Sequence, residues 1–265
     1  MFLVLGYMSA ILVGISLGLI GGGGSILTVP ALVYLFDVSA VHATAYSLFI
    51  VGLTSLYGAV KFAKAGLIHG KTTVIFAIPS LISVYLTRLL VVPAIPDPVL
   101  NISNITISKD AFLLLFFAGV MLLAAVSMIR GRKDNDSSGD LNYRYGLIAI
   151  EGAVVGLITG LVGAGGGFLI IPALVLLVGL PMKQAVATSL AIIAVKSLFG
   201  FIGDLQNLAG QIDWSLLTAF SVLSLFGIVL GAMMSKKIPG EKLKKAFGYF
   251  VLFFAFFMIY KEGLS

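Results

Sequence analysis

Two glycine-rich blocks, each followed by a proline, occupy equivalent places in the two halves of this chain. The first is GGGGSILTVP, from Gly21 to Pro30, and the second is GAGGGFLIIP, from Gly163 to Pro172. The offset of 142 positions between the two prolines holds without a gap from Gly14 to Val60. Under this offset the glycines, the proline and several serines coincide, which apolar composition alone does not produce. The chain is therefore a tandem repeat of two homologous halves, a pattern that in apolar chains is typical of transporters.

The composition excludes a water-soluble protein. Hydrophobic residues make up 60% of the chain and charged residues 11%, whereas soluble domains carry about 25% charged residues. We therefore predict an all-α integral membrane protein in contact with the lipid bilayer. The net charge of +6 belongs to loops that orient the chain, so it does not indicate nucleic-acid binding. The absence of cysteine excludes disulfides, thiol chemistry and cysteine-based metal sites.

Ten apolar segments follow one another along the chain, and the second segment of each half is too short to cross a membrane. We expect membrane segments at about 1–20, 25–36, 41–60, 72–92, 111–130, 145–162, 167–180, 184–203, 214–234 and 246–260. A spanning helix needs about 20 residues, but 25–36 and 167–180 have the length of half-helices. Each half is thus predicted to contain a glycine-broken helix hairpin followed by three transmembrane helices. The first segment shows no basic start or cleavage site, so we interpret it as a retained membrane segment.

The distribution of basic residues predicts the orientation of the segments. If each glycine-broken pair returns to its starting side, nearly all lysines and arginines of the loops fall on one face, which the positive-inside rule assigns to the cytoplasm. Both termini then lie outside the cell. The second half is inserted upside down relative to the first, so the chain forms two inverted repeats. We predict the first repeat at 1–130, a cytoplasmic linker at 131–144 and the second repeat at 145–265.

The glycine blocks are candidates for an anion-binding site. Glycine lets the backbone leave helical geometry at little steric cost, and a new helix is expected to begin at Ser25 and near Gly167. The first N–H groups of such a helix have no partner in lipid and carry partial positive charge, so they suit an anion. The candidate backbone groups belong to Gly23, Gly24, Ser25, Gly165, Gly166 and Gly167. The alternative is that glycine only permits tight helix packing, since GxxxG spacing also occurs at Gly14/Gly18 and at Gly152/Gly156/Gly160.

The third segment of each half adds candidate side chains. ATAYSLF in the first half matches AVATSLA in the second, which singles out Ser47, Thr188 and Ser189. Lys196 lies seven residues after Ser189, on the same helix face, and well inside an apolar span. An intramembrane lysine indicates function by default. The alternatives are a lysine whose amine reaches the membrane interface and a lysine paired with Asp204.

Arg88 is the other candidate cation for the anion, because a guanidinium can bind an oxyanion through two N–H groups. It can equally be an interfacial residue near a helix end. Glu151 and His42 are weak candidates for proton coupling, with ion pairing and helix capping as the respective alternatives. No His/Asp/Glu cluster indicates a metal, no Ser/His/Asp set indicates catalysis, and we expect neither an enzyme nor a cofactor.

The chain resembles the TauE/SafE family of sulfite and sulfonate exporters, also known as the toluene-sulfonate uptake permease family. The resemblance rests on GLIGGGGSILTVPALVYL, its repeat GLVGAGGGFLIIPALVLL, and the segments HATAYSLF and AVATSLA. It implies a carrier of sulfur-containing anions in a bacterial or archaeal plasma membrane. The first copy departs from the T-S-L pattern, with Tyr46 where the second copy has Thr188, so the two halves of the site are not chemically identical.

These observations together predict a secondary transporter that moves sulfite, a sulfonate or an organosulfonate by alternating access, coupled to the proton gradient. An anion channel of the same architecture is the alternative. A channel opens its site to both sides at once, whereas a carrier gives saturable flux and counterflow.

Overall fold

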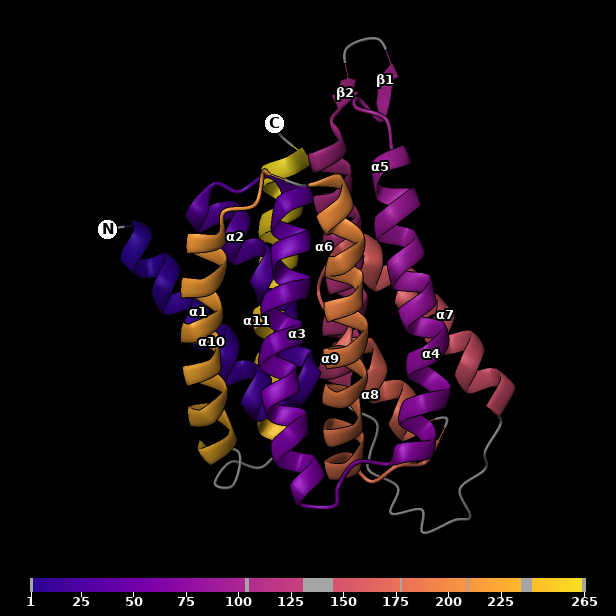
Figure 1. Cartoon of the computed structure of the whole chain (residues 1–265). Coiled ribbons are helices and arrows are strands. Elements are labelled where there is room, and N and C mark those ends of the chain that lie inside the picture. Colours follow the sequence, from indigo (N-terminus) through magenta and orange to yellow (C-terminus); the bar gives the residue numbers. More distant parts are fainter. Residues whose placement is uncertain are drawn as a thin grey trace.

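The computed structural model is a bundle of long helices, and it describes residues 2–102, 105–130, 145–176, 178–208, 210–234 and 240–263. The first half contains α1 (Phe2–Ile20), the 3₁₀ helix η1 (Gly21–Leu27), α2 (Thr28–Phe36), α3 (Ala40–Lys64), α4 (Gly70–Leu86), the π-helix η2 (Thr87–Val91), α5 (Val92–Ala94), β1 (Leu100–Ile102), β2 (Ile105–Ile107) and α6 (Lys109–Arg130). The second half contains α7 (Tyr145–Val162), α8 (Gly167–Leu176), α9 (Met182–Asn207), α10 (Trp214–Met234) and α11 (Gly240–Gly263). The short strands β1 and β2 pair antiparallel in a hairpin beyond the helices (Figure 1).

The lengths of the helices confirm an all-helical, multi-pass membrane protein. Within the described residues, six helices are long and apolar enough to cross a membrane: Ala40–Lys64, Gly70–Ala94, Lys109–Ser127, Tyr145–Val162, Lys183–Asn207 and Trp214–Met234. The helices that follow the glycine blocks are short, with 9 residues in α2 and 10 in α8. The first block itself differs from the expectation, because it continues as a 3₁₀ helix from Gly21 and the α-helix begins only at Thr28.

Equivalent positions of the two halves adopt the same backbone conformation at the ends of the short helices. Asp37 and Gly179, which are 142 positions apart, both have left-handed φ angles, 56° and 75°. The next residue in each half donates its N–H to an equivalent carbonyl, Val38 to Leu32 and Leu180 to Leu174. This left-handed turn satisfies carbonyls that the helix end leaves open. The repeat seen in the sequence is therefore a repeat of structure at these turns.

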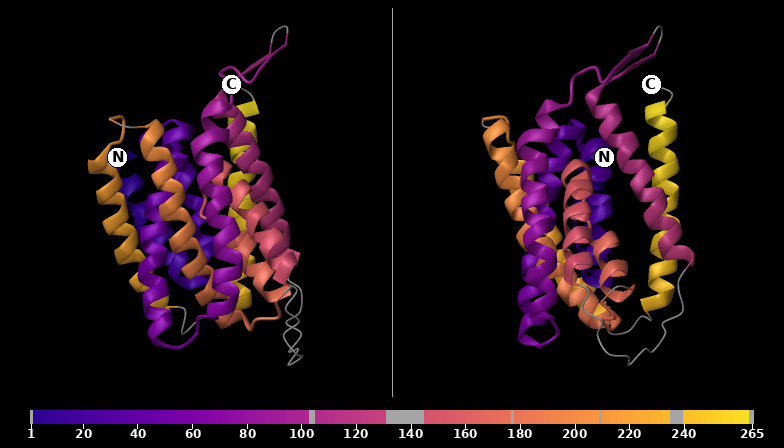
Figure 2. Two further views of the ribbon diagram at one scale, coloured as in Figure 1. Left: turned by 45° about the vertical axis from the view of Figure 1, so that its right-hand side comes forward. Right: turned by 90° about the vertical axis from the view of Figure 1, so that its right-hand side faces the viewer.

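The main helix–helix contacts each join a helix of the first half to a helix of the second half. α1 packs on α10, and α7 packs on α4; α3 packs on α9, and α6 packs on α11. The glycine stripes permit two of these contacts, because a β-carbon at Gly14 would lie 2.0 Å from the Ser224 carbonyl oxygen, and one at Gly156 would lie 2.4 Å from that of Ser80. Small residues at such crossings let two backbones approach closely. Each half therefore packs mainly on the other, and the halves do not form separate bodies (Figure 2).

The bundle has two distinguishable ends. At one, the hairpin end, lie the β1–β2 hairpin and the C-terminal end of α11, and α1 also begins toward it (Figure 1). α3 and α6 end toward the other, which we call the linker end after the predicted linker 131–144; this linker itself lies outside the described residues. α3 runs from the hairpin end to the linker end, whereas α9, its equivalent in the second half, runs back (Figure 1).

Candidate functional site

The two glycine blocks meet inside the bundle. A β-carbon built on Gly167 would lie 2.1 Å from the Cα atom of Gly22, so the two backbones are in direct contact. The buried hydroxyl of Ser25 donates to the carbonyl oxygen of Gly22 over 2.8 Å and also to the carbonyl oxygen of Ala164. A hydroxyl from the first block thus satisfies a carbonyl of the second. This cross-link places both broken helices at one central point.

Each glycine block also lies against the third segment of the opposite half. In the second block, Gly163 contacts Thr44 and Gly165 contacts Val51, both on α3. In the first block, Gly21 contacts Val186 and Gly22 contacts Ile193, both on α9. Helical residues three or four apart share a face, so Ser47 on α3 and Ser189 on α9 belong to the faces that cover the blocks.

The two serines are not equivalent in their hydrogen bonding. Ser189 donates to the Val186 carbonyl of its own helix over 2.8 Å. Ser47 is fully buried, and its hydroxyl has no hydrogen-bond partner among the described residues. A buried hydroxyl without a partner is unfavourable. Ser47 therefore retains free hydrogen-bonding capacity on the face that covers the second block.

Lys196 lies beside the second glycine block. Its side chain is fully buried, and its Nζ donates to the Thr159 hydroxyl over 2.8 Å. A β-carbon built on Gly166 would lie 2.9 Å from this Nζ, so the amine touches the glycine turn. Within the described residues no carboxylate lies within ion-pair distance of the lysine, because Asp204 is bound elsewhere. Neither alternative interpretation of Lys196 matches this arrangement, since the amine does not reach the surface and does not pair with Asp204.

Among the residues that the structure describes, the first block has no such cation. The equivalent of Lys196 is Thr54, whose hydroxyl donates to the Ile50 carbonyl of its own helix over 2.6 Å. The equivalent of Gly166 is Gly24, which packs on the Ser16 side chain and the Leu17 backbone. Gly23 lies in the same 3₁₀ helix. Positive charge is therefore concentrated at the second block.

Arg88 is buried and is not an interfacial residue. It lies on the π-helix η2, and its Nε donates to Asp204 Oδ2 over 2.7 Å. Its Nη1 donates to the Thr44 hydroxyl over 3.1 Å and to the Gly160 carbonyl over 3.2 Å, and its Nη2 donates to Thr44 over 3.0 Å. A π-helical turn shifts the direction in which its side chains point, and such turns are frequent at functional sites. Thr44 and Gly160 border the second block, so Arg88 approaches the same block as Lys196.

Asp204 was considered from the sequence only as a partner for Lys196, and its contact with Arg88 was missed. The available signal was its position near the end of an apolar helix, where a carboxylate needs a cation. The sequence also contains a second cation within an apolar stretch, Arg88. Only the packing of η2 on α9 selects the arginine.

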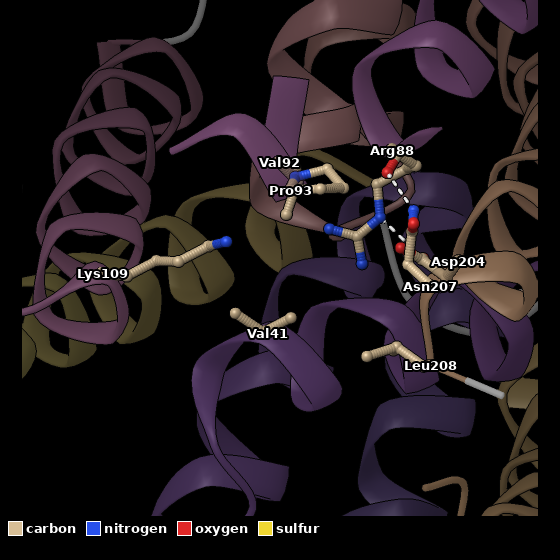
Figure 3. A pocket seen from close by; sticks show the side chains of 8 residues that line it. All are labelled: Val41, Arg88, Val92, Pro93, Lys109, Asp204, Asn207 and Leu208. Carbon is tan, nitrogen blue, oxygen red and sulfur yellow. Dashed lines mark hydrogen bonds and ion pairs between the residues drawn. The ribbon is translucent and has the colours of Figure 1, made fainter. Parts of the chain in front are cut away.

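A cavity of about 310 Å³ opens beside this ion pair, and we call it the Arg88 cavity (Figure 3). Lys109, at the start of α6, extends toward it from the side opposite to Arg88 and Asp204 (Figure 3). Asn207 lines it and donates its amide to the Arg88 carbonyl over 3.4 Å. The remaining walls are apolar: Val41, Val92, Pro93 and Leu208.

Thr188 and Tyr46, which differ in the two copies, make the same kind of bond. The Thr188 hydroxyl accepts from the His69 N–H over 3.0 Å, directly before α4. The Tyr46 hydroxyl accepts from the Asp213 N–H over 2.6 Å, directly before α10. In each half the third segment thus holds the start of the fourth helix of the other half. The two residues differ in type, but their hydroxyl groups make the same structural contact in both halves.

The two weak candidates for proton coupling, His42 and Glu151, make no hydrogen bond to the glycine blocks in the described part of the chain. His42 sits in the first turn of α3, where its Nδ1 is 2.8 Å from the Ser39 hydroxyl and its ring packs edge-on against Tyr46. Glu151 is half-buried in α7. Across the described ranges no group of three His, Asp or Glu side chains is placed to hold a metal ion.

Packing explains several of the glycines by itself. Gly166 has a φ of +69°, and a β-carbon there would lie 2.0 Å from Thr159 Cγ2. Gly24 would place a β-carbon 2.4 Å from the Leu17 nitrogen. Larger residues at these positions would therefore disturb the fold whether or not an anion binds there, so the side chains around the blocks are the better test.

Comparison with known proteins gives a consistent result. The family model described as "Sulfite exporter TauE/SafE" matches residues 7–258. A probable membrane transporter protein of Xylella fastidiosa (strain Temecula1) is 30% identical over 265 residues, covering 96% of this chain and 94% of the relative. The probable membrane transporter protein YunE of Bacillus subtilis is 30% identical over 246 residues, covering 85% of each chain. No solved structure matches.

Proposed function

Because this chain belongs to the TauE/SafE sulfite exporter family, we propose that it is a secondary transporter for a small sulfur-containing anion: sulfite, a sulfonate or an organosulfonate. The protein is a multi-pass membrane transporter. In the proposed mechanism the anion binds where the glycine blocks meet, and the site opens alternately to the two sides of the membrane.

The observation that carries this proposal is the buried cation beside the second glycine block. Lys196 Nζ touches Gly166 and donates to Thr159, with no carboxylate among the described residues to balance its charge. Electrostatic attraction is much stronger in a low-dielectric interior than in water, and an unbalanced buried charge is unfavourable. A small anion supplies the missing charge. Ser47, with its unpaired hydroxyl on the covering face of α3, is the neutral donor that we place at the same site.

We further propose that the halves 1–130 and 145–265 form an inverted repeat joined by the linker 131–144. The exchanged packing of α1 on α10 and α7 on α4 supports this proposal. The opposite directions of α3 and α9 in Figure 1 agree with it. In carriers with inverted repeats, two similar arrangements of the halves expose a midplane site to opposite sides.

The orientation that we propose places the linker end in the cytoplasm of a bacterial or archaeal cell and both termini outside the plasma membrane. Lys61 and Lys64 lie in the last turn of α3, which ends at the linker end. Loops rich in lysine and arginine remain on the cytoplasmic side. We also propose coupling to the proton gradient, for which His42 and Glu151 remain candidate groups.

Transport by purified protein in proteoliposomes tests the proposal. Internal sulfite, thiosulfate, sulfoacetate or taurine should drive counterflow of a labelled sulfonate, and carboxylates of similar size should not. Saturable flux with counterflow supports a carrier. Flux that rises linearly with concentration and shows no counterflow would indicate a channel, and an absence of flux for all of these anions would overturn the proposed function.

A further inference from the structure

The Arg88 cavity brings two cations and one carboxylate to a single hollow near the hairpin end of the bundle. Arg88 and Asp204 form one wall, and Lys109 extends toward them from the other side (Figure 3). Pockets of roughly 300 Å³ and above hold small organic ligands in many proteins, and this cavity reaches about 310 Å³. Its apolar walls also suit the carbon part of a small organic anion.

The guanidinium retains capacity for an additional acceptor. A guanidinium carries five N–H groups. Its bonds in the described structure use Nε with Asp204, Nη1 with Thr44 and Gly160, and Nη2 with Thr44, which leaves one N–H on Nη2. The terminal nitrogens of Arg88 are directed toward the cavity (Figure 3). One N–H of the guanidinium thus remains for an oxyanion in the cavity.

Charge balance determines what happens to Asp204 when an anion arrives. The cation and the carboxylate are both buried, so the pair is neutral as a whole. An anion bound to Arg88 would stand beside the Asp204 carboxylate, and two negative groups that share one buried cation favour the uptake of a proton by one of them. If Asp204 takes up this proton, the anion becomes the counter-charge of Arg88.

We propose that the Arg88 cavity is a second binding site for the transported anion, at which its oxyanion group replaces Asp204 as the counter-charge of Arg88 while Asp204 takes up one proton. The inference rests on the proposed transport function and deepens it by assigning the coupling proton to Asp204. One anion and one proton enter together, and no bond other than the O–H bond of the carboxyl group is formed.

Other titratable and charged groups near the pair are His42 on α3 and Lys109 and Asp110 on α6. His42 lies in the first turn of α3, where its Nδ1 is 2.8 Å from the Ser39 hydroxyl. Asp110 Oδ1 accepts from the Val41 N–H over 3.3 Å, so this carboxylate is engaged with the start of α3. Lys109 adds a positive charge on the far side of the cavity. Lys109 favours the entry of an anion into the cavity, and Asp204 is the carboxylate that competes with the anion for Arg88.

Arg88 connects the wall of the cavity to the second glycine block through its buried partners. Arg88 binds Thr44 and the Gly160 carbonyl, and Thr44 contacts Gly163 at the start of the second glycine block. Lys196 touches Gly166 within that block. Arg88 and Lys196 are therefore linked through the second glycine block and its contacts.

The proposed exchange, in which the anion replaces Asp204 as the counter-charge of Arg88, is tested in the wild-type protein by measuring proton uptake during anion binding. Benzenesulfonate is the probe because it stays ionised across the pH range, whereas sulfite itself titrates. Its binding to purified protein is measured by calorimetry in Tris and in triethanolamine, which differ in ionisation enthalpy and contain no sulfonate. At a pH where free Asp204 is ionised, we expect uptake of about one proton per bound anion, and an affinity that falls about tenfold for each unit by which the pH rises.

Asp204→Asn provides the second arm of the test, since asparagine keeps an acceptor for Arg88 but cannot take up a proton. Its binding should show no proton uptake and no pH dependence. Asp213→Asn is the matched control at the same end of the bundle, because Asp213 caps the Leu216 N–H and asparagine caps equally well; it should behave as wild type.

Each outcome decides the proposal. Wild-type binding without proton uptake, or full uptake in the folded Asp204→Asn protein, would overturn the exchange and leave the transport function standing. If Asp204→Asn does not fold, the wild-type calorimetry decides alone. Failure of the wild type to bind benzenesulfonate, sulfite, thiosulfate, sulfoacetate and taurine would overturn the proposed function, and the exchange with it.

Discussion

Arg88 and Asp204, 116 positions apart in the sequence, form a buried ion pair in which Arg88 Nε lies 2.7 Å from Asp204 Oδ2. The arginine side chain is fully buried, and that of the aspartate is 4% exposed. The pair joins the π-helical turn after α4 to the end of α9. It therefore connects the first half of the chain to the second at the wall of the Arg88 cavity.

Removing one partner of this ion pair should lower the unfolding free energy of the protein more than replacing both partners. Asp204→Ala leaves a buried guanidinium without a counter-charge, which costs about 3–5 kcal/mol of unfolding free energy. The double variant Arg88→Met, Asp204→Leu replaces the pair with apolar groups and should lose much less. Thermal unfolding of the purified variants measures both. A double variant less stable than Asp204→Ala would show that the pair does not behave as a coupled unit.

Lys196→Met should separate function from stability. The substitution removes a buried charge that has no carboxylate partner in the described structure, so the protein should unfold at an equal or higher temperature. Anion affinity should fall by about one to two orders of magnitude, as expected for loss of a charge-assisted contact. Lys64→Met, at the exposed end of α3, is the control and should change neither quantity. Wild-type affinity in Lys196→Met would exclude the lysine from the anion site.

Gly167→Ala should destabilise the protein through the contact between the glycine blocks. Its β-carbon would lie 2.1 Å from Gly22 Cα, and overpacking of this kind costs about 1–3 kcal/mol. A β-carbon at Gly119 in α6 would meet no atom of the described residues within 4 Å, so Gly119→Ala should be neutral or stabilise by about 0.5–1 kcal/mol. The unfolding temperatures of the two variants are compared. Equal unfolding temperatures would mean that the blocks separate readily.

Thr188→Val and Tyr46→Phe should have similar effects, because each removes the acceptor of one bond between the halves. The His69 and Asp213 N–H groups would lose their hydroxyl partners, at a cost of about 0.5–1.5 kcal/mol each. Anion affinity of the folded protein should stay unchanged. A selective loss of affinity in Thr188→Val would instead return Thr188 to the anion site.

Cysteine labelling should report opposite sides for two equivalent loops. Ala65 follows α3 and Gln211 precedes α10, and both are exposed in a chain without cysteine. In intact cells an impermeant maleimide should label Gln211→Cys, and it should label Ala65→Cys only after permeabilisation. Labelling of both from the same side would contradict the inverted repeat, and the reversed pattern would contradict the proposed orientation alone.

Much of the fold could be predicted from the sequence because it depends on local properties. The apolar segments predicted membrane helices, and the glycine blocks predicted short second helices in both halves. The 142-residue offset correctly indicated shared structure, down to the left-handed residues Asp37 and Gly179. The form of the first block was not predictable, because a run of glycines permits a 3₁₀ helix as readily as an open turn.

The candidate site was only partly visible in the sequence. Lys196 could be singled out because a lysine within an apolar helix is unusual. Its contact with Gly166, the unpaired hydroxyl of Ser47, and the bond of Thr188 to His69 depend on how α3, α4 and α9 pack. The 142-residue offset shows which residues of the two halves correspond, but it does not show which residues are in contact.

Composition, segment length and the repeated glycine blocks are properties of the chain, so they suffice to identify a duplicated, all-helical membrane protein of the TauE/SafE family. The pairing of Asp204 with Arg88, which leaves Lys196 without a carboxylate among the described residues, depends on how the helices pack. A buried carboxylate is stabilised by whichever cation packing brings within hydrogen-bonding distance. That choice arises from contacts between helices more than a hundred residues apart.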